Sequence, residues 1–186
     1  SIGLMSGTSM DGIDASIIRS DGEKSIKIID DLYLKYDDIT KSELKKTVDL
    51  CTTKKRYKKL IKLIKKVEKK ITLLHATACK KIIKRNQKID VSLIGFHGQT
   101  ILHKPNNGYS IQIGNSQLLS NIMRKKVISN FRDNDILKGG QGAPLASLYH
   151  KLILSKINIK LPTAIINIGG ISNITYLKSK DIFYSY

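Results

Sequence analysis

The chain has 186 residues, 41% of them hydrophobic and 6% aromatic, and its 33 Lys and Arg against 15 Asp and Glu give a net charge of +18. This length and hydrophobic content suit one good core or two small ones, which excludes a collagenous, low-complexity or disordered chain. No apolar run reaches the roughly 18 residues of a membrane span, and the first residues lack the layout of a secretory signal, so we expect a cytoplasmic protein.

Three strands are predicted first, at Ile2 to Met5, Ile13 to Arg19 and Ser25 to Lys35, and turn residues join them as two consecutive hairpins. The first turn lies in the stretch GLMSGTSMDGID, residues 3–14. Its glycines and hydroxyl side chains bury little apolar area, which indicates a turn whose backbone approaches a ligand, with a phosphate as the candidate. A purely structural hairpin is the alternative that this composition leaves open.

Two helices are predicted next. The first covers Ile39 to Leu50, with Thr40 as N-cap and Glu43 at the spacing of a capping box. The second runs from about Lys54 to Arg85, where lysines surround one apolar stripe. The stripe consists of Leu60, Ile64, Val67, Ile71, Leu74 and Ala78. We interpret the lysines as a solvated helix face, because a nucleic-acid groove would concentrate charge beside stacking aromatics.

Strands then alternate with helices, which predicts a mixed sheet in an α/β fold. Residues 90–96 are predicted to form a buried strand that delivers His97-Gly98-Gln99-Thr100 at its C-terminal end, where open α/β sheets place ligand groups. A short strand at SIQIGN, a helix from about Ser116 to Met123 and a strand at KKVISNF follow.

The last third of the chain contains two glycine-rich segments. Residues 139–142, Gly-Gly-Gln-Gly, run into Pro144 at a predicted helix start, and a glycine-rich loop before a helix N-terminus can bind an anion. Residues 164–177, AIINIGGISNITYL, predict a second hairpin that is similar to the first. Two such hairpins suggest two related half-sites rather than a tandem repeat.

The thiols and two of the histidines are given no role in the chemistry. Cys51 and Cys79 lack the spacing of metal ligands, so we expect two reduced thiols. His75 and His103 are interpreted as ordinary surface or helix residues.

Five motifs occur in order along the chain: GLMSGTSMDGID, GFHGQTILHKP, SIQIGN, FRDNDILKGGQGAPL and INIGGISNIT. Together they resemble the anhydro-N-acetylmuramic acid kinases of bacterial cell-wall recycling over essentially the whole chain. The resemblance implies an actin-like, hexokinase-like ATPase fold of two lobes, each built on a ribonuclease-H-like mixed sheet. We expect residues 1–155 to form the N-terminal lobe and residues 156–186 the first hairpin of the second lobe.

The resemblance also implies a reaction and its cofactors. Such enzymes use ATP, Mg²⁺ and a water to open the 1,6-anhydro ring of anhydro-N-acetylmuramate and phosphorylate O6. Asp11 is either a ligand of hydrated Mg²⁺ or a cap of its own turn. The implied ATP-binding residues are Gly7, Thr8, Ser9, Met10, Asp11, Gly12, Ile13 and Asp14, with Asn167, Gly169, Gly170 and Asn173 in the second hairpin.

The sugar is expected beside polar residues at strand ends, because an amino-sugar acid requires hydrogen-bonding groups and a cation. Arg132 is the candidate for the lactyl carboxylate, since a guanidinium offers a two-point match. Any one of these residues has the alternative of a hydrogen bond that only stabilises a loop. The predicted sugar contacts are His97, Gln99, Gln112, Asn115, Arg132 and Asp135.

One departure from the family pattern concerns the catalytic base. In the family this base is an Asp in an FD-[TC]-GPGN motif, and we expect it just beyond Tyr186, so no catalytic residue is assigned. We expect an inactive N-terminal fragment whose partners are ATP and an amino sugar, with no specific nucleic acid and no membrane; a homodimer of the full-length protein stays open. The alternative is a repurposed, lysine-rich kinase-like lobe that binds nucleic acid or acts as a scaffold.

Overall fold

The computed structural model describes residues 1–157, 159–169, 172–179 and 182–185. The chain divides into two compact units, one made of residues 1–104 and 110–131 and the other of residues 105–109 and 132–186. Each unit is described by itself, and the expected lobe boundary between residues 155 and 156 stays a prediction. No helix in the described ranges is long and apolar enough to cross a membrane.

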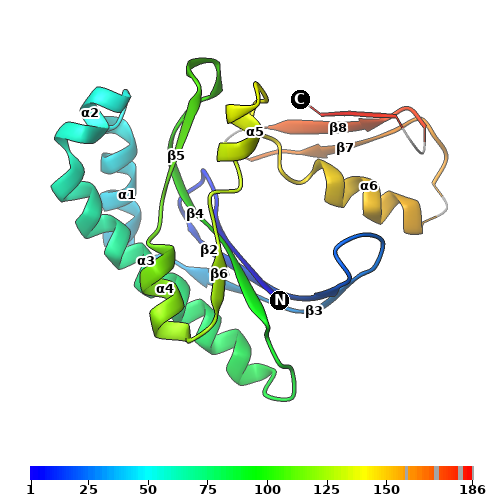
Figure 1. Ribbon diagram of the computed structural model, residues 1–186, viewed down its shortest axis with the longest axis horizontal. Helices are drawn as coiled ribbons and strands as arrows, with labels where there is room; N and C mark the ends of the chain where they lie inside the picture. The colour runs from blue at the N-terminus through cyan, green and yellow to red at the C-terminus, as the bar shows by residue number, and fades with distance from the viewer. Residues whose placement is uncertain (158, 170–171, 180–181, 186) are drawn as a thin grey trace. The chain divides into compact units, whose positions relative to one another are not determined.

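The first unit is built on a single mixed sheet (Figure 1). Its strands are β1 (Ile2–Ser6), β2 (Gly12–Ser20), β3 (Ile26–Lys35), β4 (Leu93–Lys104), β5 (Tyr109–Ile113) and β6 (Lys126–Ile128). The strand order is β3-β2-β1-β4-β5, and β6 pairs with β4 as well. The first three strands are antiparallel, whereas β4 is parallel to β1 and β6 is parallel to β4. This arrangement confirms the predicted α/β class and its ribonuclease-H-like mixed sheet.

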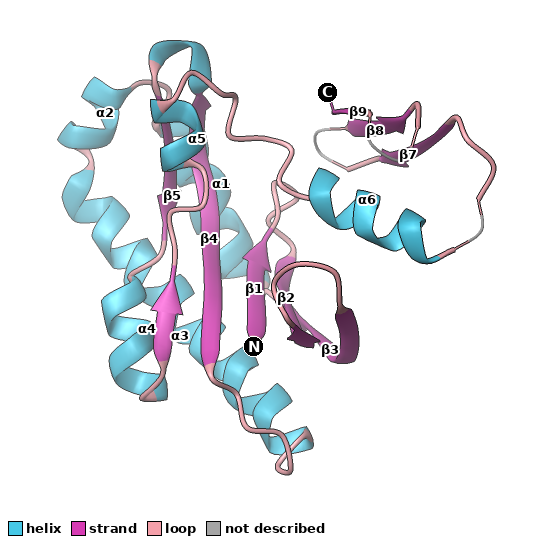
Figure 2. Ribbon diagram, turned by 45° about the vertical axis from the view of Figure 1, so that its right-hand side comes forward, coloured by secondary structure: helices cyan, strands magenta, loops and turns pink. Residues whose placement is uncertain are grey.

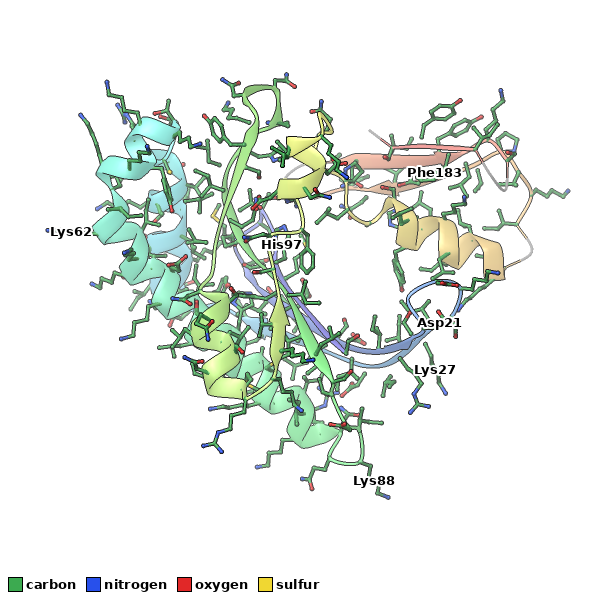
Figure 3. The ribbon with its side chains drawn as sticks, viewed as in Figure 1. Asp21, Lys27, Lys62, Lys88, His97 and Phe183 are labelled. Carbon is green, nitrogen blue, oxygen red and sulfur yellow. The ribbon has the colours of Figure 1, made fainter. Side chains whose placement is uncertain are left out.

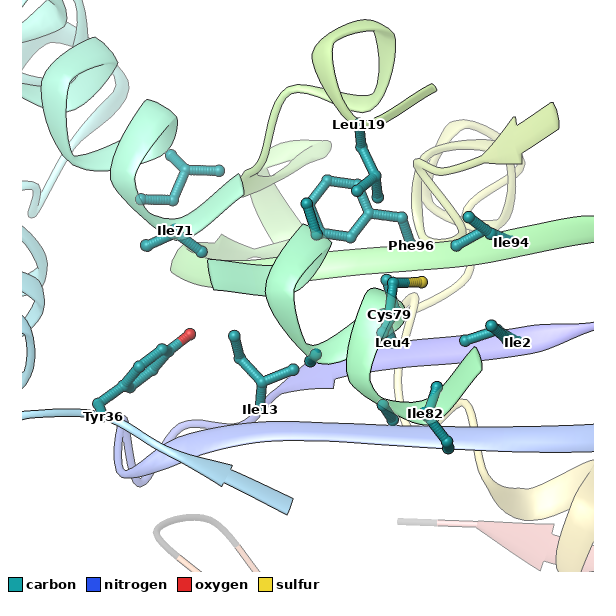
Figure 4. Close-up of a cluster of buried hydrophobic side chains, with 14 of the residues drawn as sticks. Ile2, Leu4, Ile13, Tyr36, Ile71, Cys79, Ile82, Ile94, Phe96 and Leu119 are labelled. Atoms are coloured by element: carbon teal, nitrogen blue, oxygen red, sulfur yellow. The ribbon is translucent and has the colours of Figure 1, made fainter. Parts of the chain in front are cut away.

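Helices cover one face of this sheet, as Figure 2 shows. They are α1 (Asp38–Leu50), α2 (Lys54–Lys59), α3 (Ile61–Arg85) and α4 (Ser116–Met123). Alternate residues of β1 are buried, so Ile2 and Leu4 point into the core while Gly3 and Met5 are exposed. The core lies between α3 and the strands, where Ile13, Ile71 and Phe96 meet (Figure 4).

Two helix predictions need correction. The N-cap of α1 is Asp37 rather than Thr40: its carboxylate accepts a hydrogen bond from the backbone N–H of Thr40 at 2.6 Å, so the helix begins one residue earlier than predicted. The long lysine helix is interrupted at Leu60, which ends α2 and precedes α3. No residue of α2 is fully buried, and Tyr57 packs against the core while partly exposed.

The predicted apolar stripe of the long helix is confirmed by its burial. Ile64, Val67, Ile71 and Ala78 are buried, and Leu60 and Leu74 pack against the core while partly exposed. The two thiols are free, as expected, and both are buried. Burial raises the pKa of the Cys79 thiol to about 12, so this thiol stays protonated and unreactive at neutral pH.

His75 is in a helix as predicted, but it is not a surface residue. Its ring is fully buried against the ring of Phe96, with centroids 4.9 Å apart, and its Nδ1 donates to the carbonyl of Ile71 at 2.9 Å. Its Nε2 has no hydrogen-bond partner among the described residues. Burial therefore lowers the pKa of His75 to about 4, since the cation would be buried without compensation.

Because the pKa of His75 is lowered in the folded chain, we expect the protein to lose stability in mild acid. The unfolded chain binds a proton near pH 6.5 and the folded chain only near pH 4, so the free energy of unfolding should fall as the pH drops through this window. Between pH 7 and pH 4.5 we expect a loss of roughly 2 kcal/mol from this one group. Urea unfolding of the wild type and of His75→Leu at about pH 7 and about pH 4.5 measures this change in the free energy of unfolding. An equal loss in the two proteins would contradict this assignment.

The second unit contains a separate antiparallel sheet in the order β7-β8-β9. Its elements are α5 (Asp133–Leu137), α6 (Ser147–Lys156), β7 (Thr163–Asn167), β8 (Asn173–Leu177) and β9 (Phe183–Ser185). The predicted hairpin is confirmed as β7 and β8, whereas α5 and β9 were not predicted. The helix expected to start at Pro144 starts at Ser147 instead, and the Ser147 hydroxyl donates to the Pro144 carbonyl at 2.9 Å.

Candidate functional site

The turn between β1 and β2 is the centre of the candidate site. The backbone N–H of Met10 donates to the carbonyl of Gly7 at 3.1 Å, and Met10 takes a φ of 53°, so the chain reverses tightly. The Ser9 hydroxyl donates to the Asp11 carboxylate at 2.6 Å, and this hydrogen bond lowers the pKa of Asp11. The turn therefore presents an ionised carboxylate beside backbone N–H groups and exposed hydroxyls.

The two glycines of this turn have different structural roles. A Cβ on Gly12 would lie 2.6 Å from the ring of Tyr33 and 2.7 Å from the carbonyl oxygen of Leu34, so only glycine lets β2 and β3 approach here. A Cβ on Gly7 would meet only the Ser9 hydroxyl, at an ordinary 3.6 Å. Packing within the described chain explains Gly12 but not Gly7, and close approach of a ligand would explain Gly7.

The remaining predicted residues of the ATP segment differ in exposure. Thr8 and Ser9 are exposed, and Asp14 lies on the exposed face of β2, where desolvation raises the pKa of its carboxyl. Ile13 is fully buried in the core, so any contact that it makes with a ligand has to come from its backbone. The segment therefore consists of a polar turn followed by the start of β2, where Ile13 is a core residue and Asp14 is exposed.

The strand before the predicted ligand groups is longer than expected. His97 to Thr100 lie inside β4, which continues to Lys104, so the expectation that they follow the strand is wrong. The β1–β4 register shifts by one residue, from Leu4 opposite Phe96 to Ser6 opposite Gln99. Gly98, with a φ of +69°, lies at this bulge.

Gln99 is fully buried, and its amide is engaged at both atoms. Its Oε1 accepts from the Ser6 hydroxyl at 2.6 Å, and its Nε2 donates to the carbonyl of Gly7 at 3.1 Å. The buried hydroxyl of Tyr36 donates to the Ser6 hydroxyl oxygen at 3.0 Å. The sequence analysis did not assign Ser6 or Tyr36 to the site. The available signal was Ser6, a hydroxyl residue at the end of the apolar strand β1.

The other predicted sugar contacts of the first unit also have hydrogen bonds within the chain. The Nδ1 of His97 donates to the Gly98 carbonyl at 2.9 Å, and the amide of Gln112 donates to the Ser110 hydroxyl at 2.6 Å. The side chain of Asn115 is the N-cap of α4, accepting from the N–H of Leu118. Each of these three side chains therefore makes a hydrogen bond that stabilises the chain itself, and its contact with a sugar stays a prediction.

Arg132 and Asp135 belong to the second unit, and both hydrogen-bond the backbone of one residue, Gly142. The Arg132 guanidinium donates to the carbonyl of Gly142 at 2.5 Å, and the Asp135 carboxylate accepts from the N–H of Gly142 at 2.7 Å. A Cβ on Gly140 would overlap the Asp135 carboxylate. Burial lowers the pKa of Arg132 from its high ordinary value. These contacts fold the glycine-rich loop back onto α5.

His103, interpreted as a surface or helix residue, lies in β4 and is partly buried, and its ring hydrogen-bonds the Ser110 hydroxyl through Nδ1 at 2.9 Å. In the second hairpin, Asn167 and Asn173 face each other across β7 and β8, and Gly169 is exposed beside them. Gly170 lies outside the described residues, as does Tyr186.

The described residues could hold a magnesium ion through one carboxylate together with phosphates and waters, but not through a cluster of protein ligands. No group of three His, Cys, Asp or Glu side chains comes together in the ranges that the structure describes. Mg²⁺ is commonly held by one or two carboxylates together with substrate phosphates and waters. A partly exposed Asp11 with a lowered pKa, in a turn of backbone N–H groups and hydroxyls, fits that arrangement.

The lysines of α2 and α3 form a basic face, here meaning Lys54, Lys55, Lys58, Lys59, Lys62, Lys65, Lys66 and Lys69, all of them exposed. Figure 3 shows Lys62 extending from α3 into solvent. The neighbouring Lys70 forms an ion pair with Glu43 at 2.7 Å. The face contains no tryptophan, because the chain has none, and the exposed lysines match the predicted solvated helix face.

Comparison with known proteins relates the whole chain to one family. The family model described as anhydro-N-acetylmuramic acid kinase matches residues 1–186. A protein of that name from Pelagibacter ubique is 50% identical over 181 residues, which cover 97% of this chain and 48% of the relative. Relatives of the same name from Agrobacterium fabrum and Rhizobium etli are 38% and 40% identical, each over 95% of this chain and 48% of their own length. The chain thus spans about half the length of the curated relatives it matches.

Proposed function

This chain belongs to the anhydro-N-acetylmuramic acid kinase family, and from that premise we propose that it supplies the first phosphate-binding turn and part of the sugar site of an ATP-dependent sugar kinase. In the proposed reaction, water adds at C1 as the 1,6-anhydro bridge opens, and O6 takes the terminal phosphoryl group of ATP. We place this reaction in the recycling of peptidoglycan in the cytoplasm.

The turn at residues 7–11 is the observation that carries the proposal. Phosphoryl transfer requires positioning and charge stabilisation more than covalent chemistry, and backbone N–H groups at a tight turn supply both to phosphate oxygens. Thr8 and Ser9 of the turn are exposed, Gly7 leaves room for close approach, and the flanks of the turn are hydrogen-bonded to buried side chains. Asn167 and Asn173 in the second hairpin are proposed as the matching contacts of the second unit.

Within this proposal Asp11 is the residue that would hold Mg²⁺, which offsets the negative charge of the transferred phosphoryl group. The sugar is proposed to contact His97, Gln112 and Asn115 of the first unit and Arg132 and Asp135 of the second. Arg132 is the proposed partner of the lactyl carboxylate, because a guanidinium offers a carboxylate a two-point match. A homodimer is compatible with the proposal and adds nothing to its argument.

We propose that residues 1–186 alone do not turn over, because they span about half of the relatives' length. A phosphorylation assay with ATP and 1,6-anhydro-N-acetylmuramic acid, read by mass spectrometry, tests this. Fusion to the part of the Pelagibacter ubique relative outside the matched region should raise the rate by at least about 10², the typical contribution of one catalytic acid or base. Turnover by residues 1–186 alone would refute the inactivity, and a folded, ATP-binding fusion that leaves the sugar unmodified would refute the reaction.

The alternative function, a lysine-rich lobe that binds nucleic acid or acts as a scaffold, rests on the basic face. A positive helix face attracts polyanions at low salt through counterion release, without any specific site. The face presents neither the tryptophans nor the rows of stacking aromatics on which single-stranded nucleic acids bind. The kinase proposal is therefore preferred.

A further inference from the structure

The hydrogen bonds beneath the phosphate-binding turn assign a role to residues that the family resemblance left as a sugar contact or did not mention. Ser6, Tyr36 and Gln99 come from three separate segments, and each is at least 96% buried. Their polar atoms meet directly below the turn at residues 7–11. We call these three side chains the turn anchor.

The bulge in β4 brings Gln99 to the turn. In an unshifted register the residue opposite Ser6 would be Gly98, because Leu4 lies opposite Phe96. The extra residue in β4 instead brings Gln99 opposite Ser6, and a bulge next to a functional site commonly re-aims a side chain in this way. Gln99 then bonds Ser6 through its oxygen and the Gly7 carbonyl through its nitrogen.

Gln99 has little capacity left for a sugar. Its oxygen is occupied by the Ser6 hydroxyl, and its two N–H donors reach the carbonyls of Gly7, at 3.1 Å, and Thr100, at 3.2 Å. The side chain is also fully buried within the first unit. A ligand contact would require breaking a buried hydrogen bond, which leaves a polar group unsatisfied at considerable cost.

Tyr36 connects both ends of the turn. Its backbone N–H donates to the carbonyl of Asp11 at 2.9 Å, and its hydroxyl donates to Ser6, the residue just before the turn. Burial raises the pKa of Tyr36 to about 12, so the hydroxyl is protonated and available as a donor at neutral pH. Figure 4 shows the Tyr36 ring lying beside the core residue Ile13.

We propose that the turn anchor fixes the peptides at both ends of the turn so that the N–H groups between them are preorganised for a phosphate, and that Gln99 and Tyr36 are positioning residues rather than sugar contacts. The inference rests on the proposed function for the identity of the ligand. Groups held in place before binding raise affinity because the ligand does not have to order them.

The test uses residues 1–186 with Gln99→Met, which keeps the length of the side chain but removes the three hydrogen bonds of the amide, to Ser6, Gly7 and Thr100. Tyr36→Phe is the milder variant, because it removes only the hydroxyl and keeps the backbone bond to Asp11. Thr47→Val is the matched control: Thr47 is buried in α1 and donates to the carbonyl of Glu43, so it loses a buried hydrogen bond away from the turn.

Two quantities are measured for each protein: the affinity for ATP with Mg²⁺, and the hydrogen-exchange rate of the Met10 amide, which bonds the Gly7 carbonyl. We expect Gln99→Met to weaken ATP binding about tenfold and to speed exchange at Met10 by a similar factor, with smaller changes in Tyr36→Phe. Thr47→Val should change neither quantity at the turn, even if it lowers the melting temperature.

The outcomes separate this inference from the proposed function. Unchanged Met10 exchange in both Gln99→Met and Tyr36→Phe would overturn the turn anchor, whatever the ligand. If the Met10 amide exchanged faster in the variants but the wild type did not bind ATP, the result would support the turn anchor and count against the proposed ligand. An unchanged ATP affinity, combined with lost binding of 1,6-anhydro-N-acetylmuramic acid, would return Gln99 to the sugar site and overturn the inference.

Discussion

Gly7→Val is expected to weaken the binding of ATP with Mg²⁺ about 100-fold while the melting temperature of the chain stays within about 2 °C. The binding loss follows from the proposed close approach of a phosphate to the backbone at Gly7, which a branched side chain would obstruct. The fold should tolerate the change, because a Cβ at this position would meet only the Ser9 hydroxyl oxygen within 4 Å among the described residues beyond its chain neighbours. Calorimetric titration and thermal unfolding measure the two effects.

Gly3→Val is the matched control for this substitution. Gly3 also lies in the β1 region, and a Cβ there would meet no atom within 4 Å, but it is four residues away from Gly7 and on the exposed face of the strand. It should therefore bind ATP as tightly as the wild type. If the two valine variants lost affinity equally, or if Gly7→Val kept wild-type affinity, the turn would not be the phosphate site.

Gly98→Ala is expected to have the largest effect on stability, lowering the free energy of unfolding by about 2 to 6 kcal/mol. Its φ of +69° disfavours any L-residue, and a Cβ would overlap the carbonyl oxygen of Ile113 on the neighbouring strand. Backbone strain and overpacking typically cost about 1 to 3 kcal/mol each. Urea unfolding measures the sum.

Gly108→Ala separates the two contributions. Gly108 has a similar φ of +75°, but a Cβ there would meet nothing within 4 Å, so this variant carries only the conformational strain. We expect it to lose about 1 to 2 kcal/mol. A loss at Gly98 no larger than the loss at Gly108 would show that β5 moves away without cost and that the bulge in β4 is not tightly packed.

The elements with strong local signals could be predicted from the sequence. The first three strands agree with the structure to within one residue, because β-branched runs end at glycine and aspartate turns. The helix Ser116–Met123 matches at both ends, although its N-cap, Asn115, was predicted only as a sugar contact. The predicted N-cap of α1 was wrong because two capping residues lie close together there: Thr40 was predicted, and Asp37 caps the helix.

The site could be predicted only in part, because its decisive contacts join residues far apart in the chain. A glycine-rich turn is visible locally, but the bond between Ser6 and Gln99 spans 93 residues and depends on a register shift. The burial of His75 also required the sheet, since its helix alone does not show that Phe96 lies beneath it. The five-motif resemblance predicted the family, which the match over residues 1–186 confirms.

The most direct test of the account is a backbone amide NMR titration of residues 1–186 with ATP and Mg²⁺ at moderate salt. The account predicts saturable shifts concentrated at residues 7–14, with Gly7 and Met10 among the largest, and small changes along α2 and α3. The contrary result would be shifts spread over the exposed lysines of the basic face, reproduced by tripolyphosphate and abolished by added salt. That pattern would mean that this chain binds ATP only as a polyanion and that the turn at residues 7–11 is a structural hairpin.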